Sequence, residues 1–219
     1  MRRACALIPL LLLGACGQWD QAVEIPVVAT WNGEPVTCAS DGIALTDLRF
    51  YISNPRLTDA DGRAHDVRFA TEFAWQNDVV ALIDLEDGEG ACRNGTAATF
   101  DRLLGVVRAG DYRGLRFTVG VPFRVNHANP LTAGPPLDDP DMHWHWRSGY
   151  KFLRVGVANG DDGFWLHAGS AGCEGTVGVR LMVVLIAAKC VELATEPLAR
   201  RGARGQSRDE RLGQIQVAP

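Results

Sequence analysis

Residues 141–152 read Asp-Met-His-Trp-His-Trp-Arg-Ser-Gly-Tyr-Lys-Phe, and this stretch holds two of the six Trp and two of the five His in the chain. Successive side chains of a β-strand point to opposite faces of the sheet. If the stretch is a strand, Met142, Trp144 and Trp146 make one face, which is mainly aromatic. His143 and His145 make the opposite face. Two interpretations stay open here. It is either a core strand with two surface histidines, or a site that uses imidazoles as metal ligands or proton carriers.

The segment that leads into this stretch, Pro122 to Pro140, contains five Pro. This composition predicts a long irregular loop, and long loops in compact domains tend to be either functional or disordered. Elsewhere, alternating apolar residues and Gly or Asn turns predict short strands. We expect them at Val23–Trp31, Ile43–Ser53, Val79–Leu85, Thr99–Val107, Gly114–Val121, Lys151–Val157, Gly163–His167 and Leu181–Ala188.

Turn signals divide the early strands, at Asn32-Gly33, Asn54-Pro55 and Asp61-Gly62. Short strands at near-regular spacing indicate an all-β fold with little helix. We therefore predict an antiparallel β-sandwich, Ig-like or jelly-roll-like, with long loops. A chain of 219 residues is long enough for one such domain with a sizeable core.

The N-terminus has the features of an export signal. Arg2 and Arg3 precede an apolar run, Ala6–Gly14, that is too short to span a bilayer and ends at Cys16 in a lipobox-like sequence. We predict a lipoprotein signal peptide over residues 1–16 with Cys16 lipidated; the alternatives are an ordinary signal cleaved near Ala15 and a chance run of Leu. Lipidation would anchor the chain in the periplasm or at the outer membrane surface. We expect the β-sandwich domain over residues 17–191 and a disordered or divergent tail over 192–219.

The cysteines agree with export. Beyond the signal, four remain, which are Cys38, Cys92, Cys173 and Cys190. In an oxidising compartment four cysteines most simply form two disulfides, with three possible connectivities. We favour Cys38 with Cys92 and Cys173 with Cys190. A metal site made of these thiols is less favoured, because no Cys-x-x-Cys spacing occurs.

Composition and motifs exclude several classes of function. The formal net charge of -4, without a basic patch interleaved with aromatics, argues against a nucleic-acid partner. The sequence contains no Gly-x-Ser-x-Gly elbow, Gly-rich phosphate loop or His-Glu-x-x-His. We therefore expect a binding protein rather than an enzyme.

The histidines are the main candidates for chemistry. His65 follows an Asp-Gly turn, and we expect it to be exposed to solvent. The other four lie at predicted strand ends or in the long loop, and could converge at one end of a sandwich; they are His127, His143, His145 and His167. Imidazole suits copper, zinc, iron and nickel, and Met142 would be a soft ligand that prefers Cu(I).

Several segments of the chain resemble the MbnP family, also described as the four-Cys members of a metallo-mystery pair. The similarity covers roughly Val23 to Cys173. The segments that carry it are Asp47–Asn54, Gly120-Val-Pro, Asn126-His127, Met142–Phe152 and Leu166–Cys173. The resemblance implies an exported Cu(I)-binding β-sandwich for copper homeostasis. It also implies a partner, a di-haem protein of the MauG and cytochrome c peroxidase class.

In this family the first Trp of the Trp-x-Trp pair is oxidised to kynurenine, which implies that role for Trp144. Its new amine, with His127 and His167, would hold copper (Cu+), and Met142, His143 and His145 are additional candidates. Two other functions stay open. One is a module that stacks an extracellular glycan on Trp144, Trp146 and Tyr150, and the other is a copper-dependent redox enzyme.

Overall fold

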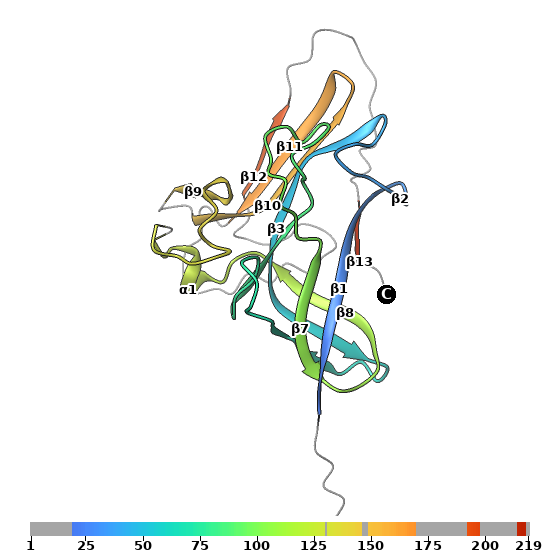
Figure 1. Ribbon diagram of the computed structural model, residues 1–219, viewed down its shortest axis with the longest axis vertical. Coiled ribbons are helices and arrows are strands. Elements are labelled where there is room, and N and C mark those ends of the chain that lie inside the picture. Colours follow the sequence, from blue (N-terminus) through green and yellow to red (C-terminus); the bar gives the residue numbers. More distant parts are fainter. Residues whose placement is uncertain (1–18, 130, 146–148, 170–191, 198–213, 218–219) are drawn as a thin grey trace, which may run out of the picture.

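A computed structural model describes residues 19–129, 131–145, 149–169, 192–197 and 214–217. These residues form two antiparallel sheets and almost no helix (Figure 1). The smaller sheet has the order β13-β1-β7-β5, with β2 also paired to β1. Its strands are β1 (Asp20–Trp31), β2 (Glu34–Pro35), β5 (Arg68–Phe69), β7 (Arg102–Arg108) and β13 (Gln214–Val217).

The larger sheet has the order β12-β11-β10-β3-β4, with β6 and β8 also paired to β3 and β9 to β10. Its strands are β3 (Ile43–Asp59), β4 (Ala64–Asp66), β6 (Val80–Asp84), β8 (Tyr112–Val119), β9 (His143–His145), β10 (Gly149–Asn159), β11 (Asp162–Gly169) and β12 (Glu192–Pro197). Two short helices interrupt the long loop before β9, namely α1 (Phe123–Asn126) and the 3-10 turn η1 (Pro140–Met142).

One hydrophobic core lies between the sheets. The alternation of β1 buries Ile25, Val27 and Ala29 and leaves the residues between them exposed. These side chains join one cluster with Leu103 of the same sheet and Phe50 of the larger sheet. The predicted antiparallel β-sandwich is confirmed, because each sheet buries one apolar face against the other.

Strand β3 is the centre of the larger sheet, and it is longer than predicted. The expected turn at Asn54-Pro55 was wrong, because the strand continues to Asp59. Asn54 takes a left-handed conformation, φ 50°, and the pairing register with β8 shifts between Ser53 and Arg56. The two residues therefore make a bulge-like irregularity inside one strand rather than a hairpin.

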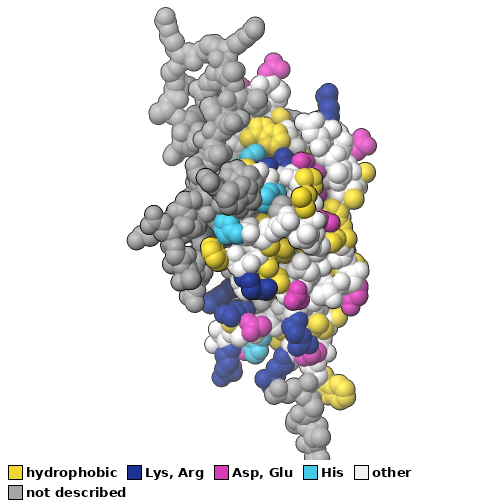
Figure 2. All heavy atoms as spheres, turned by 90° about the vertical axis from the view of Figure 1, so that its left-hand side faces the viewer, with side chains coloured by type: hydrophobic (Ala, Val, Ile, Leu, Met, Phe, Trp, Pro, Cys, Tyr) yellow, Lys and Arg dark blue, Asp and Glu magenta, His cyan; other side chains and the backbone are white. Residues whose placement is uncertain are grey.

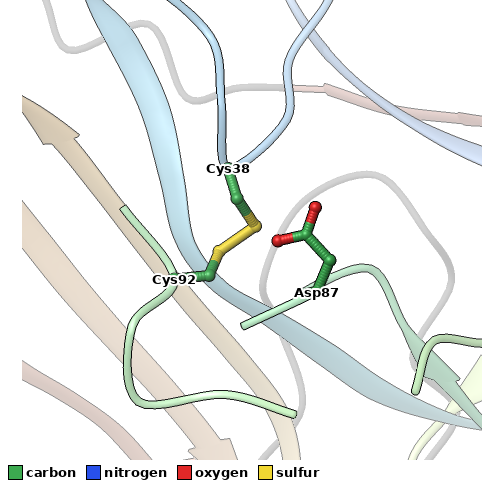
Figure 3. A group of neighbouring side chains, drawn as sticks. All are labelled: Cys38, Asp87 and Cys92. Carbon is green, nitrogen blue, oxygen red and sulfur yellow. A yellow bond between two sulfur atoms is a disulfide. The ribbon is translucent and has the colours of Figure 1, made fainter. Parts of the chain in front are cut away.

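The predicted disulfide between Cys38 and Cys92 is present, with a Cα–Cα distance of 5.4 Å (Figure 3). The carboxylate of Asp87 lies beside the two sulfurs, all within 4.8 Å of one another. A cysteine binds a metal as its thiolate, so the two sulfurs of this disulfide are not available as metal ligands. Cys173 and Cys190 lie outside the described residues, as do Cys16, Trp146 and the strand expected at Leu181–Ala188.

The C-terminal part of the chain contributes one strand to each sheet. β12 pairs with β11, and β13 pairs with β1. The division of the chain at residue 191 stays a prediction. Among the described residues, none forms a helix that is both long and apolar enough to cross a bilayer.

Candidate metal centre

The stretch 141–152 is a hairpin rather than the single strand that its alternation predicted. It begins in η1, forms the three-residue strand β9, and returns as the start of β10. The two strands pair antiparallel, with His145 opposite Gly149 and His143 opposite Tyr150. On its other side, β10 pairs with β11, with Lys151 opposite Gly169. The start of β10 therefore lies between β9 and the end of β11.

Trp144 packs directly on the backbone of Gly169, the last residue of β11. A Cβ atom at Gly169 would lie 2.8 Å from Cη2 of the indole and closer still to Cζ3. Residues i and i+2 of a strand share a face, so the His167 imidazole projects on the side where this indole lies. The next residue on that face is Trp165, whose ring centroid lies 6.2 Å from that of His167. His167 is thus set among aromatic rings at the end of the strand.

His127 caps the C-terminal end of α1 and is exposed. Its ring packs edge-on against Phe123, with centroids 5.1 Å apart. The buried side chain of Asn126 connects it to β10, because Asn126 Oδ1 accepts from Tyr150 N at 2.9 Å and Asn126 Nδ2 lies 3.2 Å from His127 Nε2. The helix end, β9 and the end of β11 therefore meet around the first residues of β10.

The remaining candidate metal ligands, Met142, His143 and His145, differ in where their side chains lie. The His143 ring lies edge-on to Tyr150, with centroids 5.0 Å apart, whereas Met142 is fully buried and belongs to the core cluster. The backbone of His145 pairs in β9, and its side chain lies outside the described residues. Figure 2 shows imidazoles gathered on one face of the molecule, with another apart from them.

His65 does not belong to this group. It lies in β4, where its Nε2 is 2.9 Å from Asp59 Oδ2 and its ring packs against Tyr112. The expectation of a solvent-exposed His65 was wrong, since the side chain is half-buried between these two partners. The β3–β4 hairpin thus uses this imidazole for its own packing.

Tyr150 is not a surface residue. Its side chain is 0 % exposed, its hydroxyl donates to Leu137 O at 2.6 Å, and its ring lies edge-on to Tyr51. A sugar stacks only on an aromatic ring whose face is open to solvent. The glycan platform of Trp144, Trp146 and Tyr150 is therefore wrong for Tyr150, which holds the hairpin on the core instead.

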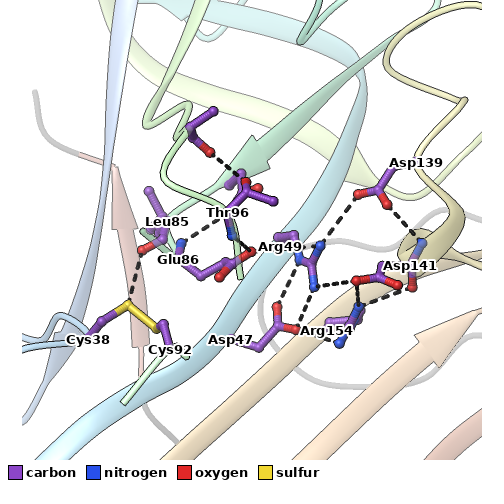
Figure 4. A network of polar contacts seen from close by, with 12 residues as sticks. Cys38, Asp47, Arg49, Leu85, Glu86, Cys92, Thr96, Asp139, Asp141 and Arg154 are labelled. Atoms are coloured by element: carbon purple, nitrogen blue, oxygen red, sulfur yellow. Dashed lines mark hydrogen bonds and ion pairs between the residues drawn. A yellow bond between two sulfur atoms is a disulfide. The ribbon is translucent and has the colours of Figure 1, made fainter. Parts of the chain in front are cut away.

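A buried ionic network anchors the start of the hairpin (Figure 4). Arg49 of β3 donates to both carboxylate oxygens of Asp47, at 3.1 and 2.9 Å, and lies 3.5 Å from Asp139 Oδ2. Arg154 of β10 lies 2.6 Å from the same Asp47 and donates to Asp141 O at 3.1 Å. Two arginines from neighbouring strands therefore hold η1, the turn that delivers His143 and Trp144.

Sequence reasoning missed this network. Its signal was the pair Asp47 and Arg49, two charges on one face in the mainly apolar first half of β3. Burial opposes the charge of Arg49, but its hydrogen bonds to Asp47 and the charge of that carboxylate raise the Arg49 pKa above its usual value. Burial also raises the pKa of Asp84, opposite Arg49 on β6, to about 7, and raises that of Glu86. The network therefore holds the cation of Arg49 near Asp84 and Glu86, two carboxylates whose pKa values are raised by burial.

These features define a class of protein, a β-sandwich that presents histidines and Trp144 at one end of its larger sheet. The family model described as MbnP matches residues 20–199. Because this match covers most of the chain, the chain belongs to the MbnP family. The predicted family is confirmed.

A solved structure, MbnP from Methylosinus trichosporium, is similar in fold and sequence. The identity is 27 %, the TM-score is 0.58, and the match covers 72 % of this chain. It spans 65 % of the length of that structure. Among curated proteins, none matches this chain.

Proposed function

We propose that this protein is an exported Cu(I)-binding protein rather than an enzyme, and that it serves copper homeostasis. Its site would consist of His127, His167 and a kynurenine made from Trp144 by a MauG-like di-haem partner. A lipid on Cys16 would hold it in the periplasm or at the outer membrane surface. Membership of the MbnP family supports a copper-associated protein, and the meeting of the three segments supports the site.

The side chains of the proposed site fit a soft, low-coordinate ion. Each neutral imidazole offers one nitrogen lone pair, which suits Cu(I). The intact indole of Trp144 offers only an N–H donor and no lone pair for a metal. As translated, the site therefore has two good donors, and a third appears only if the indole ring is opened to an arylamine.

The conversion balances as an oxidation followed by a hydrolysis. With both oxygen atoms taken from water, opening of the C2–C3 bond of the indole releases four electrons and four protons, and a further water then releases C2 as formate. The residue gains one oxygen and loses one carbon overall. The di-haem partner would pass the four electrons to an oxidant such as a peroxide, so copper affinity would depend on prior contact with that partner.

The observation that carries the proposal is the position of Trp144 on Gly169. It brings the indole to the face from which His167 projects. Asn126 ties the neighbouring His127 to the same strand end through Tyr150. These contacts support one site built from residues that are 17 to 40 positions apart in the sequence.

Peptide mass spectrometry of protein co-expressed with the partner tests this proposal. We expect the peptide that contains Trp144 to carry the gain of oxygen and loss of carbon, while Trp165, also beside His167, stays intact. Trp144→Phe should abolish both the modification and tight copper binding. Copper-loaded protein with an unmodified Trp144 would contradict the proposal.

A further inference from the structure

Trp19 presents its indole to solvent just before the first strand. The side chain is 79 % exposed, although a tryptophan ring is usually buried. Its backbone is fixed, because Trp19 O accepts a hydrogen bond from Ala109 N at 2.7 Å. The next residue, Asp20, begins β1 and pairs with Arg108 of β7. The indole is therefore held outward by a paired strand end, beside the turn that joins β7 and β8 (Figure 1).

This turn is bound to the start of β1 by side-chain contacts. The Gln21 carboxamide donates to Gly110 O at 3.2 Å and accepts from Gly110 N at 3.3 Å. We call the surface made by residues 19–21 and 108–113 the N-terminal end of the domain. Because strand pairing and these hydrogen bonds fix it, its side chains keep one arrangement relative to the rest of the sheet.

The charges of the N-terminal end are mixed, with a small positive excess. Arg108 and Arg113 are exposed and form no ion pair with any residue that the structure describes. Asp20 is paired with Arg68 at 2.5 Å, and Asp111 is an exposed carboxylate in the turn. A planar guanidinium matches the geometry of a phosphate group. An exposed indole beside such arginines suits the headgroup region of a bilayer, where amphipathic rings and cations are both favoured.

The sequence places the predicted lipid anchor next to this surface. Cys16 is three residues before Trp19, and three residues of chain span at most about 11 Å. A lipid on Cys16 would lie in the bilayer, so the indole would stay within that reach of the headgroups. This distance leaves no room for a folded protein between the N-terminal end and the membrane.

We propose that the N-terminal end rests on the phospholipid surface, with the indole of Trp19 among the headgroups and Arg108 and Arg113 on lipid phosphates. This orientation rests on the lipid on Cys16 that the proposed function includes. It requires neither copper nor the di-haem partner.

The orientation would hold the proposed copper site away from the bilayer. Arg154 of β10 pairs with Arg49 on one side and with His167 on the other. Asp59, which pairs with Tyr112 of the N-terminal end, lies ten residues after Arg49 on β3. That length of strand spans roughly 30 Å. His167 would therefore lie in the aqueous compartment, where a soluble partner can reach it.

Fluorescence quenching in vesicles tests the contact. Lipidated protein is reconstituted into vesicles of phosphatidylethanolamine and phosphatidylglycerol whose acyl chains are brominated near the headgroups, so that they quench tryptophans at that depth. We expect part of the protein emission to be quenched, and Trp19→Phe to remove that part. The matched control is Trp31→Phe, at the other end of β1, in which the quenched part should remain. Quenching that persists in Trp19→Phe would overturn the proposal.

Charge reversal tests the arginine contact. Arg108→Glu should reduce the quenching of Trp19, because it sets a carboxylate against the lipid phosphates. The control is Arg102→Glu, since Arg102 is exposed at the opposite end of β7, about 20 Å along the strand and beyond the screening length of about 8 Å. Equal losses in the two variants would refute the contact of Arg108 with phosphate.

Mass spectrometry of protein from the membrane fraction separates this proposal from the proposed function. If Cys16 has no lipid, the anchor and this orientation both fail. If Cys16 has the lipid but Trp19 is not quenched, only the orientation fails. A quenched Trp19 supports the orientation even in protein that binds no copper, because neither measurement involves the metal.

Discussion

Gly169 shows how one residue without a side chain can position a site. The indole of Trp144 occupies the space that a Cβ at this position would need. Glycine is thus required here for a close approach rather than for its backbone freedom, since its φ is not in the left-handed region. The absence of one methyl group decides where the residue proposed for oxidation lies.

We predict that Gly169→Ala displaces this indole. Overpacking at a buried position should cost about 1–3 kcal/mol of unfolding free energy, and should lower both the yield of modified Trp144 and copper affinity. Denaturant unfolding and peptide mass spectrometry measure these effects. Gly134→Ala is the control, because a Cβ there meets nothing within 4 Å; equal effects of the two substitutions would refute the explanation.

Asp84 should make stability depend on pH. Burial raises its folded-state pKa from 3.8 to about 7, so between these values the folded protein keeps a proton that the unfolded chain has lost. Stability contributed by this proton is fully present below about pH 4 and is lost as the pH rises through 7. Glu86, whose charge acts in the same direction, and Arg49, which opposes it, both contribute to this shift.

Asp84→Asn tests this dependence, because the amide resembles the protonated acid and can still accept from Glu86 N. From pH 5 to pH 8 the original protein should lose about 2–3 kcal/mol that the variant retains. Thermal unfolding at several pH values gives the comparison. Parallel pH profiles for the two proteins would show that Asp84 is not the group responsible.

At the scale of elements, the hairpin that carries Trp144 depends on ion pairs as well as on strand pairing. β9 has only three residues, which provide few backbone hydrogen bonds. Arg49 and Arg154 compensate by holding the preceding turn, η1, to β3 and β10. Short edge elements are rarely stable alone, so this anchoring is what makes a precise position for the indole attainable.

We therefore predict that Arg49→Met destabilises the fold by about 3–5 kcal/mol, since it leaves the buried carboxylate of Asp47 with less compensation. The control lies on the same strand. Arg56 pairs with Asp66 at the surface, where both side chains are more than half exposed, and Arg56→Met should cost about 0–1 kcal/mol. Denaturant unfolding of both variants separates the buried network from a general effect of removing arginine.

At the scale of the whole molecule, the disulfide between Cys38 and Cys92 closes a loop with a sequence separation of 54 residues. The enclosed segment contains β3, β4, β5 and β6, and so includes strands of both sheets. The bond restricts the unfolded chain most where its two ends would otherwise be far apart. It thus favours the packing of the two sheets against each other.

Replacing both cysteines by alanine should cost about 4 kcal/mol, the entropy of closing a loop of this length. Denaturant unfolding under oxidising conditions would show the loss. In excess dithiol, the original protein and the double variant should unfold alike, because both then lack the bond. A double variant as stable as the oxidised original would mean that the packed sheets need no such restriction.

The sequence alone was enough for the class of fold and the family, whereas it left three disulfide connectivities open and the structure decided for Cys38 with Cys92. Period-two alternation, turn residues and short motifs are local properties, and they favour strands that can bury one apolar face. Those signals could not reveal that residues 141–152 fold back as a hairpin. They could not show that β3 continues through Asn54, or that Tyr150 is buried.

Only the tertiary structure decided which side chains meet. The contact of Trp144 with Gly169, the bridge from Asn126 to Tyr150 and the ion pairs of Arg49 with Asp139 all join residues far apart in the chain. Such contacts depend on strand register and on the space left by neighbours, which no single segment encodes. Local pattern therefore determines the strands of this protein, and non-local packing determines the place where they present its histidines and tryptophan.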